Sequence, residues 1–107
     1  MYAESYIDAH EAEWKSSKHA GQWRSTMETY VYPVIGEIVL ADVDTPLVLQ
    51  ILRPIWQSKT ETAKRVRGRI ESVLDAAKSE GLRTGTNPAA WKGHLDAVLP
   101  APRKIAK

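Results

Sequence analysis

The sequence predicts an all-α domain, a small bundle of four to five helices. Apolar residues recur every three or four positions in several separate segments, which is the spacing of one helix face. Proline follows a capping residue where new segments begin. Alternation with period two occurs only in residues 35–43, where Gly36 and the acidic residues favour a connecting loop. A chain of 107 residues is long enough for one modest core, so we expect a single domain.

The composition is that of an ordinary globular domain, with 43% hydrophobic residues, 26% charged residues and a net charge of +2. The absence of cysteine excludes disulfides and thiolate metal sites. Apolar clusters such as residues 31–40 are interrupted, and none approaches the roughly 20 residues that span a bilayer. The first residues lack the basic region and apolar run of a signal peptide. We therefore expect no membrane partner. The lack of cysteine permits an intracellular setting without establishing one, and the expected location is cytoplasmic.

The first third of the chain predicts two amphipathic helices. The first covers residues 3–15. Its stripe comprises Ala3, Ile7, His10 and Trp14. Ser16 and Ser17 are suitable caps for the second helix, which we expect to run until Pro33 and Gly36 end it. Its buried face comprises Ala20, Trp23, Met27, Tyr30 and Val31.

A third helix is predicted from a cap followed by proline. Asp44 or Thr45 precedes Pro46, a residue that is favoured in the first turn of a helix. Pro54 should bend or end this helix near its last turn, because proline cannot donate the next hydrogen bond. Its broad apolar surface comprises Val48, Leu49, Ile51, Leu52, Ile55 and Trp56.

The fourth helix is the clearest element. Ser58 and Glu61 match a capping box, and we expect the helix to run to about Glu80, with Gly81 as its terminal glycine. Its buried stripe comprises Ala63, Val66, Ile70, Val73, Leu74 and Ala77. A short helix or pair of turns should follow from Asn87, which would make residues 1–99 the domain. We interpret residues 100–107 as a basic, proline-containing linker.

The front half of the fourth helix is rich in cations. Its cations are Lys59, Lys64, Arg65, Arg67 and Arg69, and its later acids are Glu71, Asp75 and Glu80. This order is the reverse of what the helix macrodipole favours. Projected at about 100° per residue, Lys64, Arg65 and Arg69 fall opposite the apolar stripe, and Arg67 lies near its margin. A phosphate backbone would select this order, whereas solvation alone would not.

Hydrogen-bond donors accompany these cations. Thr60, Thr62 and the free amides at the helix start can donate to phosphates. The outward face of the second helix adds Lys18, His19, Gln22, Arg24 and Ser25, a chemistry suited to phosphates and base edges. The simpler alternative for one basic face is a solvated surface whose cations pair with acids one turn away. Two such faces favour a nucleic-acid partner.

The sequence offers no catalytic or metal site. His10-Glu11 begins like a zinc-protease helix, but Trp14 stands where the second histidine would be, and the other two histidines have no ligand-spaced partner. Tyr30 and Tyr32 have no basic cluster tied to them, and we interpret both as core or boundary residues. We therefore expect no cofactor, no metal and no small-molecule substrate.

The ordered series of motifs resembles a known family. The motifs are Trp23, residues 28–36, Asp42-Val43, residues 52–56, residues 61–70 and Asn87-Pro88-Ala89. Together they closely resemble the core-binding domain of tyrosine recombinases, specifically the integrases of prophages and genomic islands. The resemblance covers about Ser5 to Leu99, which is nearly the whole chain.

The resemblance implies a helical bundle with a SAM-like fold that forms one jaw of a clamp around attachment-site DNA. In that family a separate catalytic domain supplies an arginine, lysine and histidine constellation and the attacking tyrosine, and this constellation cannot be located in the sequence. The chain is therefore expected to bind double-stranded DNA and to cleave nothing. The isolated domain is expected to be monomeric, while the parent recombinase assembles on DNA.

Carried over by position, the resemblance implies that the start of the second helix and the basic helix contact the major groove and flanking phosphates. The expected DNA-binding residues are Lys18, His19, Gln22, Ser25, Lys59, Thr60, Thr62, Lys64, Arg65 and Arg69. Arg24 and Arg67 are second choices because they project near the flanks. A competing hypothesis is a helical protein-interaction module whose basic face docks an acidic partner.

Overall fold

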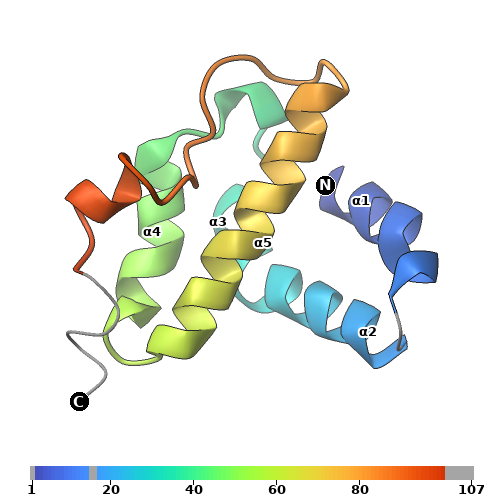
Figure 1. The fold of residues 1–107 in the computed structure, drawn as a ribbon, viewed down its shortest axis with the longest axis horizontal. Coiled ribbons are helices and arrows are strands. Elements are labelled where there is room, and N and C mark those ends of the chain that lie inside the picture. The colour runs from blue at the N-terminus through green and yellow to red at the C-terminus, as the bar shows by residue number, and fades with distance from the viewer. Residues whose placement is uncertain (1, 15–16, 101–107) are drawn as a thin grey trace.

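The domain is a bundle of helices (Figure 1). The computed structural model describes residues 2–14 and 17–100, so the expected cap Ser16, the expected helix end at Lys15 and linker residues 101–107 lie outside the described residues. The elements are α1 Tyr2–His10, the 3₁₀ turn η1 Glu11–Glu13, α2 Ser17–Thr26, the π-helix η2 Met27–Val31, α3 Tyr32–Ile35, the 3₁₀ turn η3 Leu40–Asp42, α4 Thr45–Trp56, α5 Thr60–Ser79 and the 3₁₀ turn η4 Leu95–Ala97. No strand occurs in the described part of the chain, which confirms the all-α prediction.

The N-terminal helix is shorter than the sequence predicts. α1 ends at His10, and the turn η1 leads to Trp14, whose backbone is extended (φ −83°, ψ 141°). Ala3 and Ile7 are fully buried, whereas His10 and Trp14 are half-buried. The predicted stripe is therefore fully buried only along its first half. The α-helix gives way to a 3₁₀ turn after His10, so Trp14 no longer lies on the helix face that Ala3 and Ile7 share.

The second predicted helix changes its winding along its length. α2 passes directly into η2 and then into the single turn α3. Pro33 lies in the first turn of α3 and has no amide proton, so regular α-helical hydrogen bonding cannot continue through it, and the wider π-helical turns precede it. Met27, Val31 and Ile35 are buried along this segment. The helix ends at Gly36, as predicted.

α4 begins and ends where the sequence predicts. Asp44 Oδ1 accepts a hydrogen bond from the Leu47 amide (3.2 Å), and Pro46 lies in the first turn. The helix ends at Trp56, shortly after Pro54. The predicted apolar surface is buried at Val48, Leu49, Ile51, Leu52, Ile55 and Trp56.

The start of α5 differs from the prediction. Its N-cap is Lys59, whose side chain makes no capping hydrogen bond. Ser58 Oγ instead donates to the Pro54 carbonyl (3.4 Å). The predicted capping box of Ser58 and Glu61 is therefore wrong, because the tight connection from α4 directs the serine back onto the preceding helix.

The end of α5 agrees with the prediction. Gly81 has a φ of +80°, a conformation that favours glycine, and the Leu82 amide donates to the Ala77 carbonyl (2.9 Å). The buried Arg83 then donates through Nη1 to the carbonyls of residues 40 and 43, at 2.8 and 3.1 Å. This arginine ties the chain leaving α5 to the loop before α4.

The segment after Asn87 consists of turns and η4. Asn87 Oδ1 accepts from the Ala89 amide (2.9 Å), as expected for a capping asparagine. The Trp91 ring stacks on Trp56, with ring centroids 5.4 Å apart. Trp56 Nε1 donates to the Pro100 carbonyl (2.8 Å). These contacts hold the C-terminal part of the domain against α4.

α5 lies at the centre of the bundle. It packs against α1, α4 and η2, with α4 on one side and α2 on the other in Figure 1. Its predicted apolar stripe is buried at Ala63, Val66, Ile70, Val73, Leu74 and Ala77. Because these elements cover the stripe, the polar residues of α5 are confined to its two flanks and its outer face.

Candidate nucleic-acid interface

Three cations at the front of α5 are exposed, as the sequence predicts. They are Lys59, Lys64 and Arg65. Lys64 Nζ lies 3.7 Å from Glu61 Oε2 on the preceding turn. An exposed pair of this kind contributes little to stability and is readily exchanged for another anion. The outer face at the start of α5 is therefore cationic and accessible.

Arg67 has a structural role. It lies at the margin of the stripe, as predicted, and its Nη1 donates to Glu71 Oε1 (2.7 Å) and to the Ala89 carbonyl (2.8 Å). A carboxylate thus balances its charge. A hollow of about 160 Å³ on this flank of α5 is lined by Trp56, Lys64, Arg67 and Trp91.

Arg69 is buried, so the prediction that it lies opposite the apolar stripe is wrong. Only 9% of the residue is exposed. Its Nη1 donates to the Gln22 carbonyl (3.1 Å) and to Thr26 Oγ1 (2.6 Å), and its guanidinium carbon lies 5.2 Å from the centroid of the Trp23 ring. Arg69 falls on the flank of α5 that faces α2, where contact with a distant segment decides its exposure.

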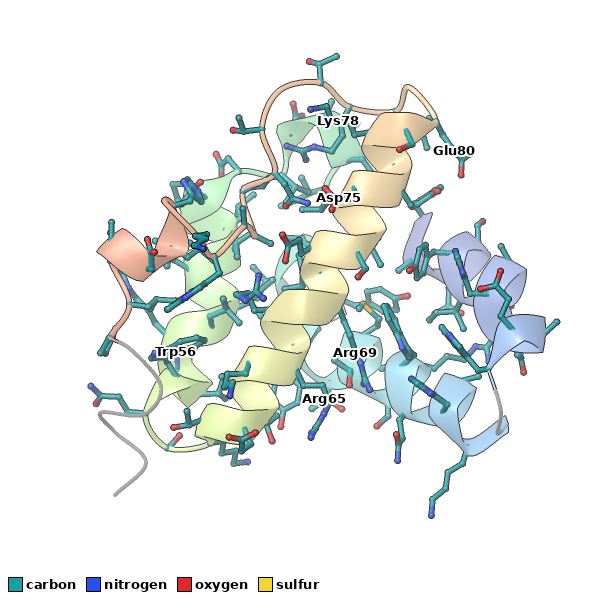
Figure 2. All side chains as sticks on the ribbon, viewed as in Figure 1. Trp56, Arg65, Arg69, Asp75, Lys78 and Glu80 are labelled. Atoms are coloured by element: carbon teal, nitrogen blue, oxygen red, sulfur yellow. The ribbon has the colours of Figure 1, made fainter. Side chains whose placement is uncertain are left out.

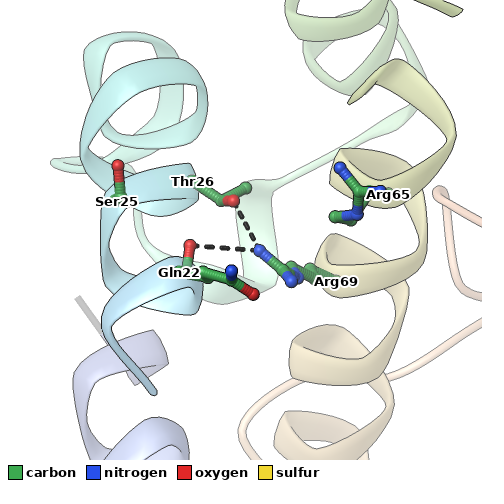
Figure 3. Close-up of a pocket in the computed structure, with 5 residues that line it drawn as sticks. All are labelled: Gln22, Ser25, Thr26, Arg65 and Arg69. Carbon is green, nitrogen blue, oxygen red and sulfur yellow. Dashed lines mark hydrogen bonds between the residues drawn. The ribbon is translucent and has the colours of Figure 1, made fainter. Parts of the chain in front are cut away.

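An open cleft of about 400 Å³ lies between α2 and α5 (Figure 3). It is lined by Gln22, Ser25, Thr26, Arg65 and Arg69. Figure 2 shows Arg65 and Arg69 side by side in the space between the two helices. The structure thus brings together four residues predicted from the two basic faces. Thr26 is the member that the sequence reasoning missed, although its spacing of four from Gln22 places both on one face of α2.

The cleft combines positive charge with hydrogen-bond donors. Among the described residues, neither Arg65 nor Arg69 lies within ion-pair distance of a carboxylate. Burial lowers the pKa of Arg69, and the neighbouring Arg65 lowers it further, since both effects oppose the charged form. An arginine nevertheless stays protonated in proteins. The cleft is lined by two guanidinium groups, two hydroxyls and one amide, and by no carboxylate. This lining is suited to an anionic ligand.

The other predicted residues do not line this cleft. Lys18 and His19 are exposed near the start of α2, and the His19 ring stacks on Trp14 with centroids 4.8 Å apart. Thr60 is half-buried, and its Oγ1 donates to a carbonyl of α4 (3.0 Å), so its proton is already engaged. Thr62 is half-buried. These side chains mark the two helix starts that flank the cleft.

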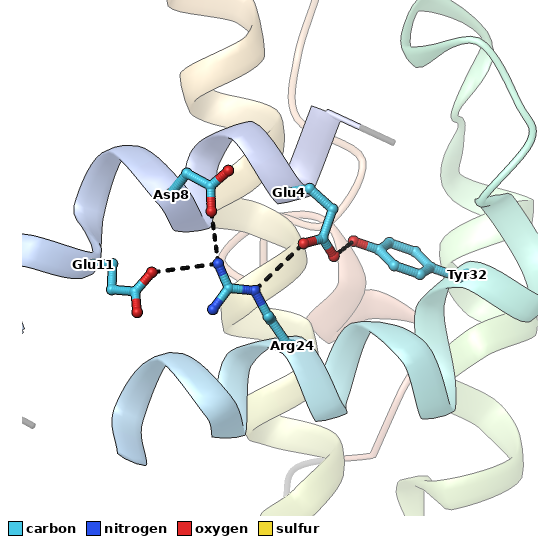
Figure 4. A network of polar contacts seen from close by, with 5 residues as sticks. All are labelled: Glu4, Asp8, Glu11, Arg24 and Tyr32. Atoms are coloured by element: carbon cyan, nitrogen blue, oxygen red, sulfur yellow. Dashed lines mark hydrogen bonds and ion pairs between the residues drawn. The ribbon is translucent and has the colours of Figure 1, made fainter. Parts of the chain in front are cut away.

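Arg24 faces α1, in a network of acidic residues (Figure 4). Its Nη2 lies 2.6 Å from Asp8 Oδ1 and 3.4 Å from Glu11 Oε1, while its Nε lies 3.4 Å from Glu4 Oε1. Glu4 Oε2 in turn accepts from the hydroxyl of Tyr32 (2.7 Å). The network connects α1 to α2 and α3, so this second-choice residue is engaged in contacts within the protein.

Two tyrosines hydrogen-bond to carboxylates near the ends of α1 and α5. Tyr2 donates to Glu80, and burial together with this bond raises the pKa of Tyr2 to about 12. Burial, followed by the bond to Glu4, also raises the pKa of Tyr32 above its ordinary value. Tyr32 and Tyr30 are half-buried, as expected for boundary residues.

The described residues contain no arrangement of three or more His, Asp or Glu side chains that could hold a metal ion. His10 Nδ1 lies 3.0 Å from Glu13 Oε1, and the His10 ring packs against Tyr6 with centroids 4.3 Å apart. Within the same part of the chain, no helix has both the length and the apolar character that crossing a membrane requires.

Comparison with known proteins shows which family this helical domain resembles. The family model of the phage integrase central domain matches residues 1–94. The chain is 34% identical over 101 residues to the prophage integrase IntZ of Escherichia coli (strain K12), a match covering 94% of this chain and 24% of that protein. The solution NMR structure of protein Nmul_A0922 from Nitrosospira multiformis has a TM-score of 0.81 and 54% sequence identity, covering 91% of this chain and 92% of that one.

The fold and these similarities define a domain related to tyrosine recombinases. The chain belongs to the phage integrase central domain family, which confirms the resemblance inferred from the sequence motifs. The match spans 24% of the length of IntZ, so the chain corresponds to one part of that integrase.

Replacing Thr26 with valine tests the contact between α2 and α5. The variant keeps the side-chain shape but leaves Arg69 Nη1 with only the Gln22 carbonyl. We expect the free energy of unfolding to fall by about 1–2 kcal/mol. Ser25→Ala, in the same cleft, should change it by less than about 0.5 kcal/mol. Urea unfolding measures both, and equal stabilities for the two variants would exclude a contribution from the Thr26 bond.

Alkaline unfolding tests the two tyrosine contacts. Because the folded-state pKa values of Tyr2 and Tyr32 are raised, their contribution to stability is complete below the unfolded value of about 10. It is lost as the pH rises, between about pH 10 and 12 for Tyr2. The double variant Tyr2→Phe, Tyr32→Phe should lose stability less steeply over this range in urea unfolding. Parallel pH curves for both proteins would contradict this expectation.

Proposed function

We propose that this domain binds double-stranded DNA as the core-binding part of a site-specific tyrosine recombinase, closing on attachment-site DNA for integration and recombination. The observation that carries the proposal is the cationic cleft between α2 and α5 in a domain of the phage integrase family. The relative IntZ is a prophage integrase, and the similarity of the chain to that protein supports the proposal.

The two helix starts that flank the cleft form the proposed DNA-facing surface. α2 offers Lys18, His19, Gln22 and Ser25, and α5 offers Lys59, Thr60, Thr62, Lys64, Arg65 and Arg69. Cations and hydroxyls bind phosphates and fix the orientation of a protein on the duplex, while side chains that reach base edges read the sequence. The free amides at the start of α5 add donors to the same surface.

In this proposal the domain holds DNA and another domain cleaves it. Residues 1–99 are the DNA-binding unit, and residues 100–107 lead toward a catalytic domain. The domain alone is monomeric, and the full recombinase assembles on its DNA site.

The affinity for DNA should fall steeply with salt. Each phosphate that the domain neutralises contributes roughly one unit to the slope of log affinity against log salt concentration. Fluorescence anisotropy with an attachment-site duplex at several salt concentrations measures this slope. The proposal fails if the duplex does not bind at low salt or if binding is independent of salt. Binding of an acidic protein in place of DNA would favour the protein-interaction alternative.

Removing two exposed cations of α5 should weaken DNA binding without unfolding the domain. We expect Lys64→Ala, Arg65→Ala to lower affinity by at least roughly tenfold and to reduce the salt slope by about two. The matched control Arg53→Ala, Lys78→Ala removes the same charge from exposed positions on α4 and the last turn of α5, neither of which lines the cleft. Figure 2 shows Lys78 toward the end of α5 opposite to Arg65 and Arg69. The control should retain binding within about threefold of the unchanged protein. Equal losses in both double variants would remove the start of α5 from the interface.

A further inference from the structure

Arg69 is a buried cation, and only some of its hydrogen-bond donors have an acceptor among the described residues. In the described structure its Nη1 carries both hydrogen bonds to α2, and Nη2 and Nε have no acceptor. A guanidinium has five N–H donors. The group therefore faces the cleft with donors to spare, although it is only 9% exposed.

The charge of Arg69 also lacks a counter-ion. Within the described residues its charged neighbour is Arg65, and their proximity is repulsive. Arg67, two positions earlier on the same helix, has Glu71 Oε1 at 2.7 Å. Burying a charge without an opposite charge is unfavourable. The contrast between these two arginines indicates that the counter-ion of Arg69 comes from outside the chain.

The remaining groups of the cleft suit one kind of anion. Ser25 Oγ and the Gln22 side chain have no hydrogen-bond partner in the described residues, and Thr26 Oγ1 accepts from Arg69, so its own proton can be donated. A phosphate group has several acceptor oxygens, which matches donors that converge from two helices. The cleft, about 400 Å³ and open to solvent, admits a phosphate that is part of a chain.

We propose that Arg65, Arg69, Ser25, Thr26 and Gln22 form a pocket for a single phosphate group, and that Arg69 serves both as a ligand of this phosphate and as the brace between α2 and α5. The identity of the phosphate as part of a DNA backbone rests on the proposed function. The pocket itself rests on the charge and hydrogen-bonding of the cleft. Because the ligand bridges the second half of α2 and α5, its binding fixes the position of α2 relative to α5.

A titration with inorganic phosphate tests the pocket without DNA. Sodium phosphate is exchanged for sodium chloride at constant ionic strength, and the arginine Nε–Hε signals and the amides of residues 22–26 are followed by NMR. We expect saturable shifts at Arg65, Arg69 and these amides. Arg65→Ala should weaken this binding by roughly tenfold, whereas Arg53→Ala, an exposed arginine on α4, should leave it unchanged. The proposal is wrong if Arg65→Ala titrates like the unchanged protein or if all surface cations shift alike.

Duplexes with a single neutral phosphate identify the source. One methylphosphonate is placed at successive backbone positions of an attachment-site duplex, and each affinity is measured. At one position we expect a loss of roughly tenfold that disappears in Arg65→Ala and persists in Arg53→Ala. The DNA assignment is overturned if the loss at every position is the same in Arg65→Ala and in the unchanged protein. If inorganic phosphate binds as expected but no duplex binds, the proposed function fails and the pocket stands as a site for free phosphate.

Discussion

Burial of one apolar stripe on α5 organises the domain. The stripe packs against α1, α4 and η2, which leaves two flanks of the helix to contact the rest of the chain. Each flank carries an arginine that joins α5 to a distant segment through a backbone carbonyl: Arg69 binds at Gln22 of α2, and Arg67 binds at Ala89 of the C-terminal segment. The position of the cleft follows from this arrangement, since its two walls are α2 and one flank of α5.

The structure shows which of the cations at the front of α5 have acidic neighbours and which do not. Cations at a helix N-terminus oppose the macrodipole, but Arg67 and Lys64 have acidic neighbours, Glu71 and Glu61, on the same helix. The charge without such compensation is concentrated on the flank that faces α2. The basic flank of α5 is thus one wall of a cleft between two helices, and an external anion bound there would balance its charge.

Local patterns predicted the helices well and long-range contacts poorly. The cap at Asp44 and the glycine after α5 depend on neighbouring residues, so the sequence revealed both. The failure at Arg69 has the opposite origin, because its side chain bonds to the distant helix α2, which helical projection cannot anticipate. The failure at Ser58 is local, since its hydroxyl donates to the carbonyl four residues earlier, at the end of α4. Four of the five cleft residues were predicted from the sequence, because they lie on the two helix faces that are rich in basic and polar residues. That these faces adjoin, and that Arg24 faces the acids of α1, required the packed structure.

The central claim is that the starts of α2 and α5 meet DNA around the cleft. An amide chemical-shift map of the domain, recorded as an attachment-site duplex is added, tests it most directly. We predict the largest changes at the first turns of α2 and α5 and along the cleft residues Gln22 to Thr26, with the C-terminal end of α5 near Glu80 unaffected. Changes confined to that far end, or a spectrum that DNA leaves unaltered, would contradict the claim.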